Sequence, residues 1–172
     1  MIEDYLSLAS RIRRELDELW RVVNKAERAV EAVHRQPEER DLYVDSAVLS
    51  LHDFYSGLER IFQQIGTIID GHIPSGAGWH RDLLEQMQAD VENLRPPVLS
   101  KEAGQSLDEF LRFRHVVRNI YAFQFDPERV ERLVTQMRST MAKVQTELLT
   151  FALFLERVGG DSLPSGMLTC SS

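Results

Sequence analysis

Two successive stretches of about thirty residues repeat apolar side chains with a period near 3.6, and this repeat restricts the fold more than any other feature. The first runs from about Glu3 to Arg35, and Pro37 ends it. The second runs from Glu38 to about Ile69, where Gly57 and Gly66 lower the helix propensity without cancelling the repeat. Helices of this length extend about 45 Å, and two joined by a short turn should pack as an antiparallel hairpin.

Two shorter helices are predicted next. The glycine-containing stretch 71–78 is a loop, after which a helix is predicted from Trp79 to about Leu94, before the pair Pro96-Pro97. Ser100 can cap a fourth helix that runs through Ile120.

Asp126-Pro127 is a strong start signal for the last helix, with aspartate as N-cap and proline at the first helical position. The apolar repeat then continues until Gly159-Gly160, which is predicted to close the helix. The sequence contains no internal repeat and no strand pattern with hairpin signals. We therefore predict an all-α, up-and-down bundle of about five helices. A single domain is expected over residues 1–158, followed by a flexible C-terminal tail over residues 159–172.

Charge and cysteine content limit the function classes. The formal net charge of −7 argues against broad, non-specific coating of nucleic acid but leaves room for a small, focused site. Cys170 is the only cysteine, so no internal disulfide can form, which fits a reducing cytosol. No apolar run has the length of a membrane span, and the start at Met1 does not read as a signal peptide. We expect a soluble, cytoplasmic protein with no membrane partner.

The histidines do not have the spacing of a metal site. They are His34, His52, His72, His80 and His115. No two of them share a helix face together with a third ligand, and no glycine-rich phosphate loop follows a strand. Neither a metal nor a cofactor is predicted. Trp79 and His80, at the start of a helix after a glycine loop, are interpreted as a structural anchor.

The stretch 111–121 is a basic island on this acidic chain. It contains three arginines, Arg112, Arg114 and Arg118, and the histidine His115. Guanidinium groups bind phosphate oxygens through two parallel hydrogen bonds and stay charged at all physiological pH values. The alternative is that cations in the last turn of a helix merely complement the helix dipole.

Helical spacing groups these side chains into a strip. Arg114, Arg118 and Tyr121 lie at i, i+4 and i+7 and share a face, with His115 and Asn119 on the neighbouring stripe. Such a strip could hold an RNA phosphate and its neighbouring 2′-hydroxyl. A solvated charged face with a tyrosine at the edge of the core is the competing interpretation.

The same stretch resembles the HEPN superfamily, and within it the HepT-like toxins of bacterial toxin–antitoxin pairs. Their motif is an arginine and a polar residue, then three further residues, a histidine, one more residue and a tyrosine. Here the segment reads Arg114-His115-Val-Val-Arg118-Asn119-Ile-Tyr121. The resemblance covers about residues 40–150. It extends to Trp79-His80, Leu83-Leu84, Met87, Arg95-Pro96, Phe113-Arg-His115 and Asp126.

The resemblance implies a type VII toxin: a metal-independent RNA endonuclease that acts as a homodimer, with two motifs facing each other. It implies that Arg114 clamps the phosphate and that Tyr121 accepts AMP from a minimal nucleotidyltransferase antitoxin. Arg112 and Arg118 are candidates for further RNA phosphate contacts.

The motif histidine is replaced by Asn119, whose amide cannot exchange a proton near neutral pH and so cannot act as a general base. Three explanations are open: an inactivated variant, a naturally impaired member kept for binding, or transfer of the proton by His115. Two other functions are therefore considered. One is a non-catalytic HEPN-type module that binds RNA or nucleotide or docks a partner, and the other is a structural helical adaptor.

Overall fold

The structure is a computed structural model that describes residues 1–119 and 125–161. Across these residues it contains five α-helices and no named strand, which confirms the predicted all-α bundle. The helices are α1 (Ile2–Arg35), α2 (Arg40–Ile65), α3 (Trp79–Gln88), α4 (Lys101–Val117) and α5 (Pro127–Asp161). A 3-10 turn (Pro37–Glu39) precedes α2, and a π-helical turn (Gly66–Asp70) follows it.

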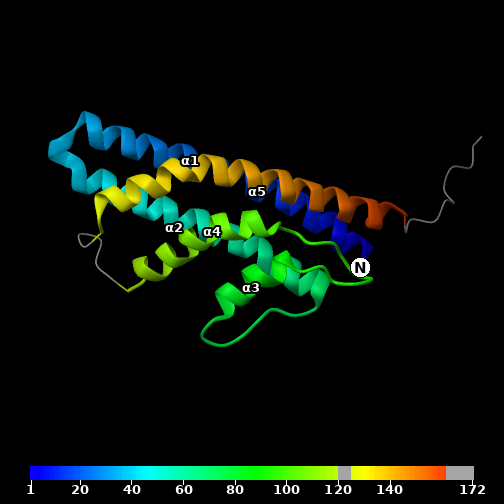
Figure 1. Cartoon of the computed structure of the whole chain (residues 1–172). Helices are drawn as coiled ribbons and strands as arrows, with labels where there is room; N and C mark the ends of the chain where they lie inside the picture. The colour runs from blue at the N-terminus through cyan, green and yellow to red at the C-terminus, as the bar shows by residue number, and fades with distance from the viewer. Residues whose placement is uncertain (120–124, 162–172) are drawn as a thin grey trace, which may run out of the picture.

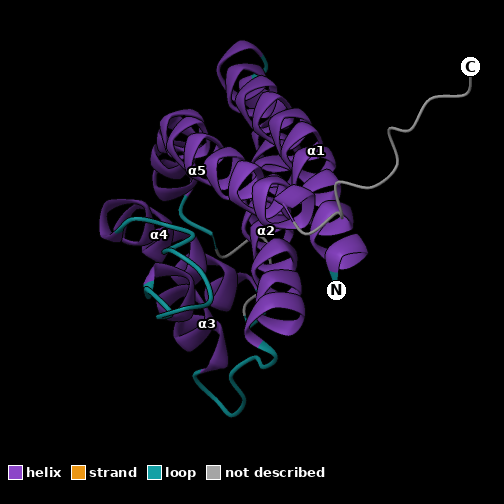
Figure 2. Cartoon of the chain, turned by 90° about the vertical axis from the view of Figure 1, so that its right-hand side faces the viewer, coloured by secondary structure: helices purple, strands orange, loops and turns teal. Residues whose placement is uncertain are grey.

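The three long helices form the body of the bundle, with α1 packed along both α2 and α5 (Figure 1). The chain reverses between α1 and α2, so these two helices form the predicted antiparallel hairpin. The shorter α3 and α4 lie together on one flank of α2, as the rotated view in Figure 2 also shows. Among the helices of the described ranges, none has both the length and the apolar character needed to cross a membrane.

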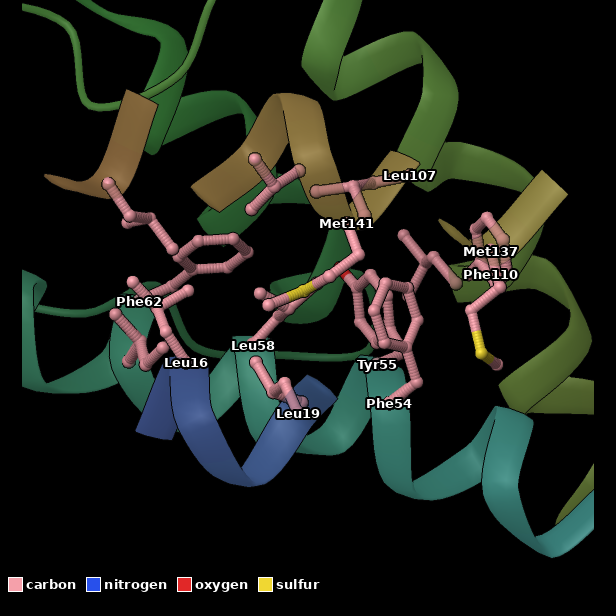
Figure 3. Close-up of a cluster of buried hydrophobic side chains, with 14 of the residues drawn as sticks. Leu16, Leu19, Phe54, Tyr55, Leu58, Phe62, Leu107, Phe110, Met137 and Met141 are labelled. Atoms are coloured by element: carbon pink, nitrogen blue, oxygen red, sulfur yellow. The ribbon is translucent and has the colours of Figure 1, made fainter. Parts of the chain in front are cut away.

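The core is formed where the apolar stripes of α1, α2, α4 and α5 meet (Figure 3). Phe54 of α2 and Phe110 of α4 join the flank to the body through an edge-to-face contact, with ring centroids 5.2 Å apart. A Cβ at Gly57 would lie 2.7 Å from Leu19 Cδ2 of α1, so any other residue would force the Leu19 side chain to move. The glycine inside the helical repeat therefore permits the close approach of α1 and α2.

The two predicted start signals, Ser100 and Asp126-Pro127, are confirmed. Ser100 Oγ accepts a hydrogen bond from Ala103 N at 3.1 Å and caps α4. Asp126 Oδ1 accepts from Glu128 N at 3.0 Å, and α5 begins at Pro127.

The predicted ends of the third and fourth helices are wrong. The third helix ends at Gln88 instead of Leu94, because the chain folds into a turn held by hydrogen bonds between Val91 and Arg95. The fourth helix ends at Val117, three residues before the predicted Ile120.

The last helix continues past Gly159-Gly160 to Asp161. A Cβ on Gly159 would lie 3.1 Å from Leu6 Cδ2 of α1, so this glycine also marks a close helix contact. The helix nevertheless ends at Asp161, directly after the predicted Gly159-Gly160 pair.

Candidate functional site

Arg114, in the last turn of α4, turns its side chain into the bundle, where only 13% of it is exposed. Its Nη1 group donates to both carboxylate oxygens of Glu59 on α2, each at 2.7 Å. Glu59 is itself buried, with 4% of its surface exposed. A buried carboxylate without a partner is strongly destabilising, and Arg114 supplies the compensating charge.

His80, in the first turn of α3, is the second partner of Glu59. Its Nδ1 lies 2.6 Å from Glu59 Oε2 and 3.1 Å from Arg114 Nη1. Because guanidinium nitrogens only donate, Nδ1 could bond to Arg114 only as an acceptor, and to the carboxylate only as a donor. The shorter, charge-assisted contact decides between the two roles. His80 Nδ1–H donates to Glu59, and the contact with Arg114 is not a hydrogen bond.

His115 lies next to this buried group and faces the surface. The ring centroids of His80 and His115 are 5.3 Å apart in an edge-to-face arrangement, with an interplanar angle of 79°. Partial burial lowers the pKa of His115, and the neighbouring His80, Arg114 and Arg118 lower it further, while Glu59 opposes them. The neutral imidazole is therefore favoured at pH 7, and a neutral imidazole can accept a proton.

Two polar atoms at this site have no hydrogen-bond partner among the described residues. They are Arg114 Nε and the hydroxyl of Tyr55, both buried. Burial raises the pKa of the Tyr55 phenol, and the negative charge of Glu59 raises it further. The arginine thus keeps donor capacity that the bundle does not use.

Arg118 and Asn119 end α4 and are exposed. The Asn119 amide donates to the backbone carbonyl of His115 at 2.8 Å, so it closes the last helical turn. The Arg118 side chain has no carboxylate within 4 Å in the described part of the chain. It is therefore available to a negatively charged ligand.

Arg112 lies away from this group. It forms an ion pair with Asp108, four residues earlier, at 2.6 Å. It also lines a recess of about 180 Å³ between α4 and α5, together with Arg129 and Arg132. The structure therefore brings Arg114 and His115 together with α2 and α3, but not with Arg112.

Tyr121 lies outside the described residues, so its position relative to Arg114 and Arg118 remains a prediction. Cys170 lies outside them as well. Over residues 1–119 and 125–161, no group of three or more histidine, cysteine, aspartate or glutamate side chains could hold a metal ion.

Sequence reasoning missed Glu59 and assigned His80 to a structural role. A usable signal was present for Glu59, which follows Leu58 on the apolar stripe of α2, where a charge requires a partner. No comparable signal identified His80, because its partner lies 21 residues away on another helix.

The profile of the HepT-like protein family matches residues 46–155, which is more than half of the chain. The matched region contains Glu59, His80, Arg114 and His115, and it leaves α1 outside. Comparisons with curated proteins and with solved structures give no match. The family match agrees with the resemblance predicted from the α4 motif, and the chain belongs to the HepT-like family.

Proposed function

We propose that this protein is a HEPN-type toxin of a type VII toxin–antitoxin pair and cleaves RNA without a metal ion. The observation that carries the proposal is the exposed imidazole of His115 between Arg114 and Arg118 at the end of α4, where the positive charges of both arginines help to lower its pKa. Membership of the HepT-like family supports it. RNA is the expected substrate because the 2′-hydroxyl supplies the nucleophile.

The proposed chemistry is an internal transfer. His115 takes the proton of the 2′-hydroxyl while O2′ attacks the adjacent phosphorus and the bond between phosphorus and O5′ breaks. The leaving O5′ takes a proton from water or from an imidazolium of the second copy. Arg118 and the exposed part of the Arg114 guanidinium stabilise the charge that develops on the phosphate.

Asn119 has no acid–base part in this scheme. Its amide instead holds the carbonyl of His115 and so fixes the residue that moves the proton. The competing explanation is that Asn119 leaves the protein impaired. In that case a histidine at this position would restore cleavage.

The assay is cleavage of a fluorescent single-stranded RNA in the presence of EDTA. We expect His115→Ala to reduce the rate by about 10²–10⁴-fold, the usual effect of losing an acid–base group. His34→Ala is the matched control, because His34 is an exposed histidine bonded to Glu131 of α5, and neither residue is among the groups that shift the pKa of His115. Asn119→His should change the cleavage rate little. If Asn119→His instead raises the rate strongly, and His115→Ala leaves the rate unchanged, the proton transfer belongs to position 119.

A non-catalytic HEPN-type module is the second candidate. The observation in its favour is that Arg114 is bound to Glu59 and position 119 carries an amide. RNA binding that depends on Arg118, with no cleavage by any variant above, would support this module and contradict the nuclease. If the protein neither binds nor cleaves RNA, the structural helical adaptor is the remaining candidate.

The expected partners are a second copy of this chain and a minimal nucleotidyltransferase antitoxin, all acting in the cytoplasm. A single copy offers few groups to surround a phosphodiester, whereas two copies related by a two-fold axis offer twice as many. Sedimentation equilibrium at micromolar concentration tests the dimer, and a clean monomer of 19.8 kDa would contradict it.

The antitoxin is expected to transfer AMP to the hydroxyl of Tyr121. The adduct would add negative charge and bulk beside the arginines and so block RNA, as phosphorylation does at other arginine sites. Mass spectrometry after incubation with ATP, magnesium and the transferase tests this. Adducts that persist in Tyr121→Phe would contradict the assignment.

A further inference from the structure

Four of the five buried polar residues in the described part of the bundle fall into two groups. Ser50 and Arg95 have hydrogen bonds that hold the backbone of their own helix or of a neighbouring turn. Glu59 and His80 bond to no backbone group in the described residues. They bond to each other and, through Glu59, to Arg114.

Such a group is not explained by stability. Replacing a buried ion pair with apolar side chains of similar volume is often neutral or stabilising, so burial of Glu59 gives the bundle no clear advantage. Its neighbours Phe54 and Leu58 fill the core without charge. A role at the site on α4 accounts for the carboxylate better.

Glu59 determines the state of the His80 ring. Since Nδ1–H donates to the carboxylate, the neutral ring has only one tautomer, with the lone pair on Nε2. Trp79 lies against the same ring, with centroids 3.7 Å apart and an interplanar angle of 31°. The hydrogen bond fixes the ring within its plane, and the indole limits its movement out of that plane.

The fixed ring of His80 in turn contacts His115. Their edge-to-face contact at 5.3 Å joins α3 to the end of α4, where an exposed side chain would otherwise sample several rotamers. The charged and titratable groups that act on His115 come from three helices. They are Glu59 of α2, His80 of α3, and Arg114 and Arg118 of α4.

We propose that Glu59 and His80 are positioning residues: Glu59 fixes the tautomer of His80 and the guanidinium of Arg114, and His80 holds the imidazole of His115. The proposal rests on the proposed RNA cleavage only for its catalytic consequence. The placement and the titration of His115 can be measured without RNA.

The first measurement uses the unmodified protein. Nitrogen-15 correlation spectra of the histidine rings report which nitrogen carries the hydrogen. We expect a protonated Nδ1 in His80 whenever that ring is neutral. A neutral His80 with its hydrogen on Nε2 would overturn the proposal, whatever the enzyme activity.

The second measurement is the NMR titration of His115 in two variants that keep side-chain size. In His80→Asn the amide can still donate to Glu59, but the ring that lowers the pKa of His115 is lost, so the pKa of His115 should rise. In Glu59→Gln the opposing negative charge is lost, so the pKa of His115 should fall. His34→Gln is the control and should shift nothing. Shifts of opposite sign are not expected from general loosening, and an unchanged His115 in both variants would overturn the proposal.

The third measurement is cleavage, in variants that melt cooperatively. We expect kcat to fall by up to roughly 10²-fold, the effect of misplacing a reacting group by about 1 Å, with KM nearly unchanged. The acidic limb of the pH–rate profile should move with the measured pKa of His115. If the unmodified protein cuts no RNA, the proposed nuclease fails while the NMR outcomes still decide the positioning role. Active variants with unchanged kcat and profile would overturn that role.

Discussion

The bundle contains two buried arginine–carboxylate pairs, and they differ in how many donors remain free. Arg95 is fully buried and uses all five N–H groups, two on Asp70 and three on the backbone carbonyls of Gln86, Ala89 and Pro96. Arg114 contacts Glu59 through Nη1 alone, and its Nε has no partner in the described ranges. We call the pair of Arg95 and Asp70 the closed pair, because the arginine has no N–H group left to donate. The pair of Arg114 and Glu59 retains donor capacity next to the exposed His115.

The difference separates an arginine that holds the fold from one that serves a site. Arg95 fixes the turn after α3 to the π-helical turn after α2, and Gln86 adds a hydrogen bond to Asp70 at 2.6 Å. A ligand could add nothing there. At Arg114 the Nε group is buried, but a phosphate could approach the 13% of the side chain that is exposed.

The largest expected effect on stability is that of Arg95→Met. It leaves the carboxylate of Asp70 buried, with 3% exposed, and frees three backbone carbonyls. Removing one partner of a buried pair costs about 3–5 kcal/mol. Urea denaturation measures the loss, and a value below about 1 kcal/mol would mean that the closed pair does not hold the fold.

Arg114→Met should cost less, about 1–3 kcal/mol, because it frees no backbone carbonyl and Glu59 keeps the hydrogen bond from His80. Its effect on RNA should instead be the larger of the two, since the phosphate clamp is lost. The same denaturation experiment and an RNA-binding titration test both parts. If Arg114→Met destabilises more than Arg95→Met, the distinction between the two pairs is wrong.

The range of an interaction along the chain explains which parts of the structure could be predicted from the sequence. The helices were predictable because the apolar repeat is local, and Ser100 and Asp126 mark two of the starts within a few residues. The ends were harder, because they depend on distant contacts. Arg95, which follows the predicted end of the third helix at Leu94, folds back onto Asp70, 25 residues earlier.

The candidate site, like the helices, was predictable only where its residues lie close together in the sequence. Arg114 and His115 belong to one short motif and were identified from it. Glu59 lies 55 residues from Arg114, so no spacing rule connects them, and only the packing of α2 against α4 does. The motif residues on α4 are therefore defined by local spacing, whereas Glu59 is defined by a contact between distant parts of the chain.

Acid should affect the closed pair in a defined direction. Burial raises the pKa of Asp70, but the hydrogen bonds from Arg95 and Gln86 outweigh it, so the pKa lies below its usual value. A carboxyl with a lowered pKa contributes stability above its unfolded pKa of about 3.9 and loses it as the pH falls through the folded value. Melting between about pH 2 and pH 5 should show a shallower slope in Asp70→Asn than in the unmodified protein. Equal slopes would mean that other carboxyls cause the acid sensitivity.

The smallest effect is expected for the exposed counterpart of the Glu59–His80 pair. His34 and Glu131 are 2.6 Å apart, the same distance, but their side chains are 64% and 42% exposed. Water solvates both groups in the unpaired state and salt screens their attraction, so the pair should contribute less than about 1 kcal/mol. For a chain of this size that corresponds to a change in Tm of less than about 4 °C. We therefore expect His34→Gln to melt nearly as the unmodified protein does, while His80→Asn, at the same donor–acceptor distance, alters both melting and the titration of His115. If the two variants behave alike, burial is not what distinguishes the pairs, and Glu59 and His80 have no special relation to the site on α4.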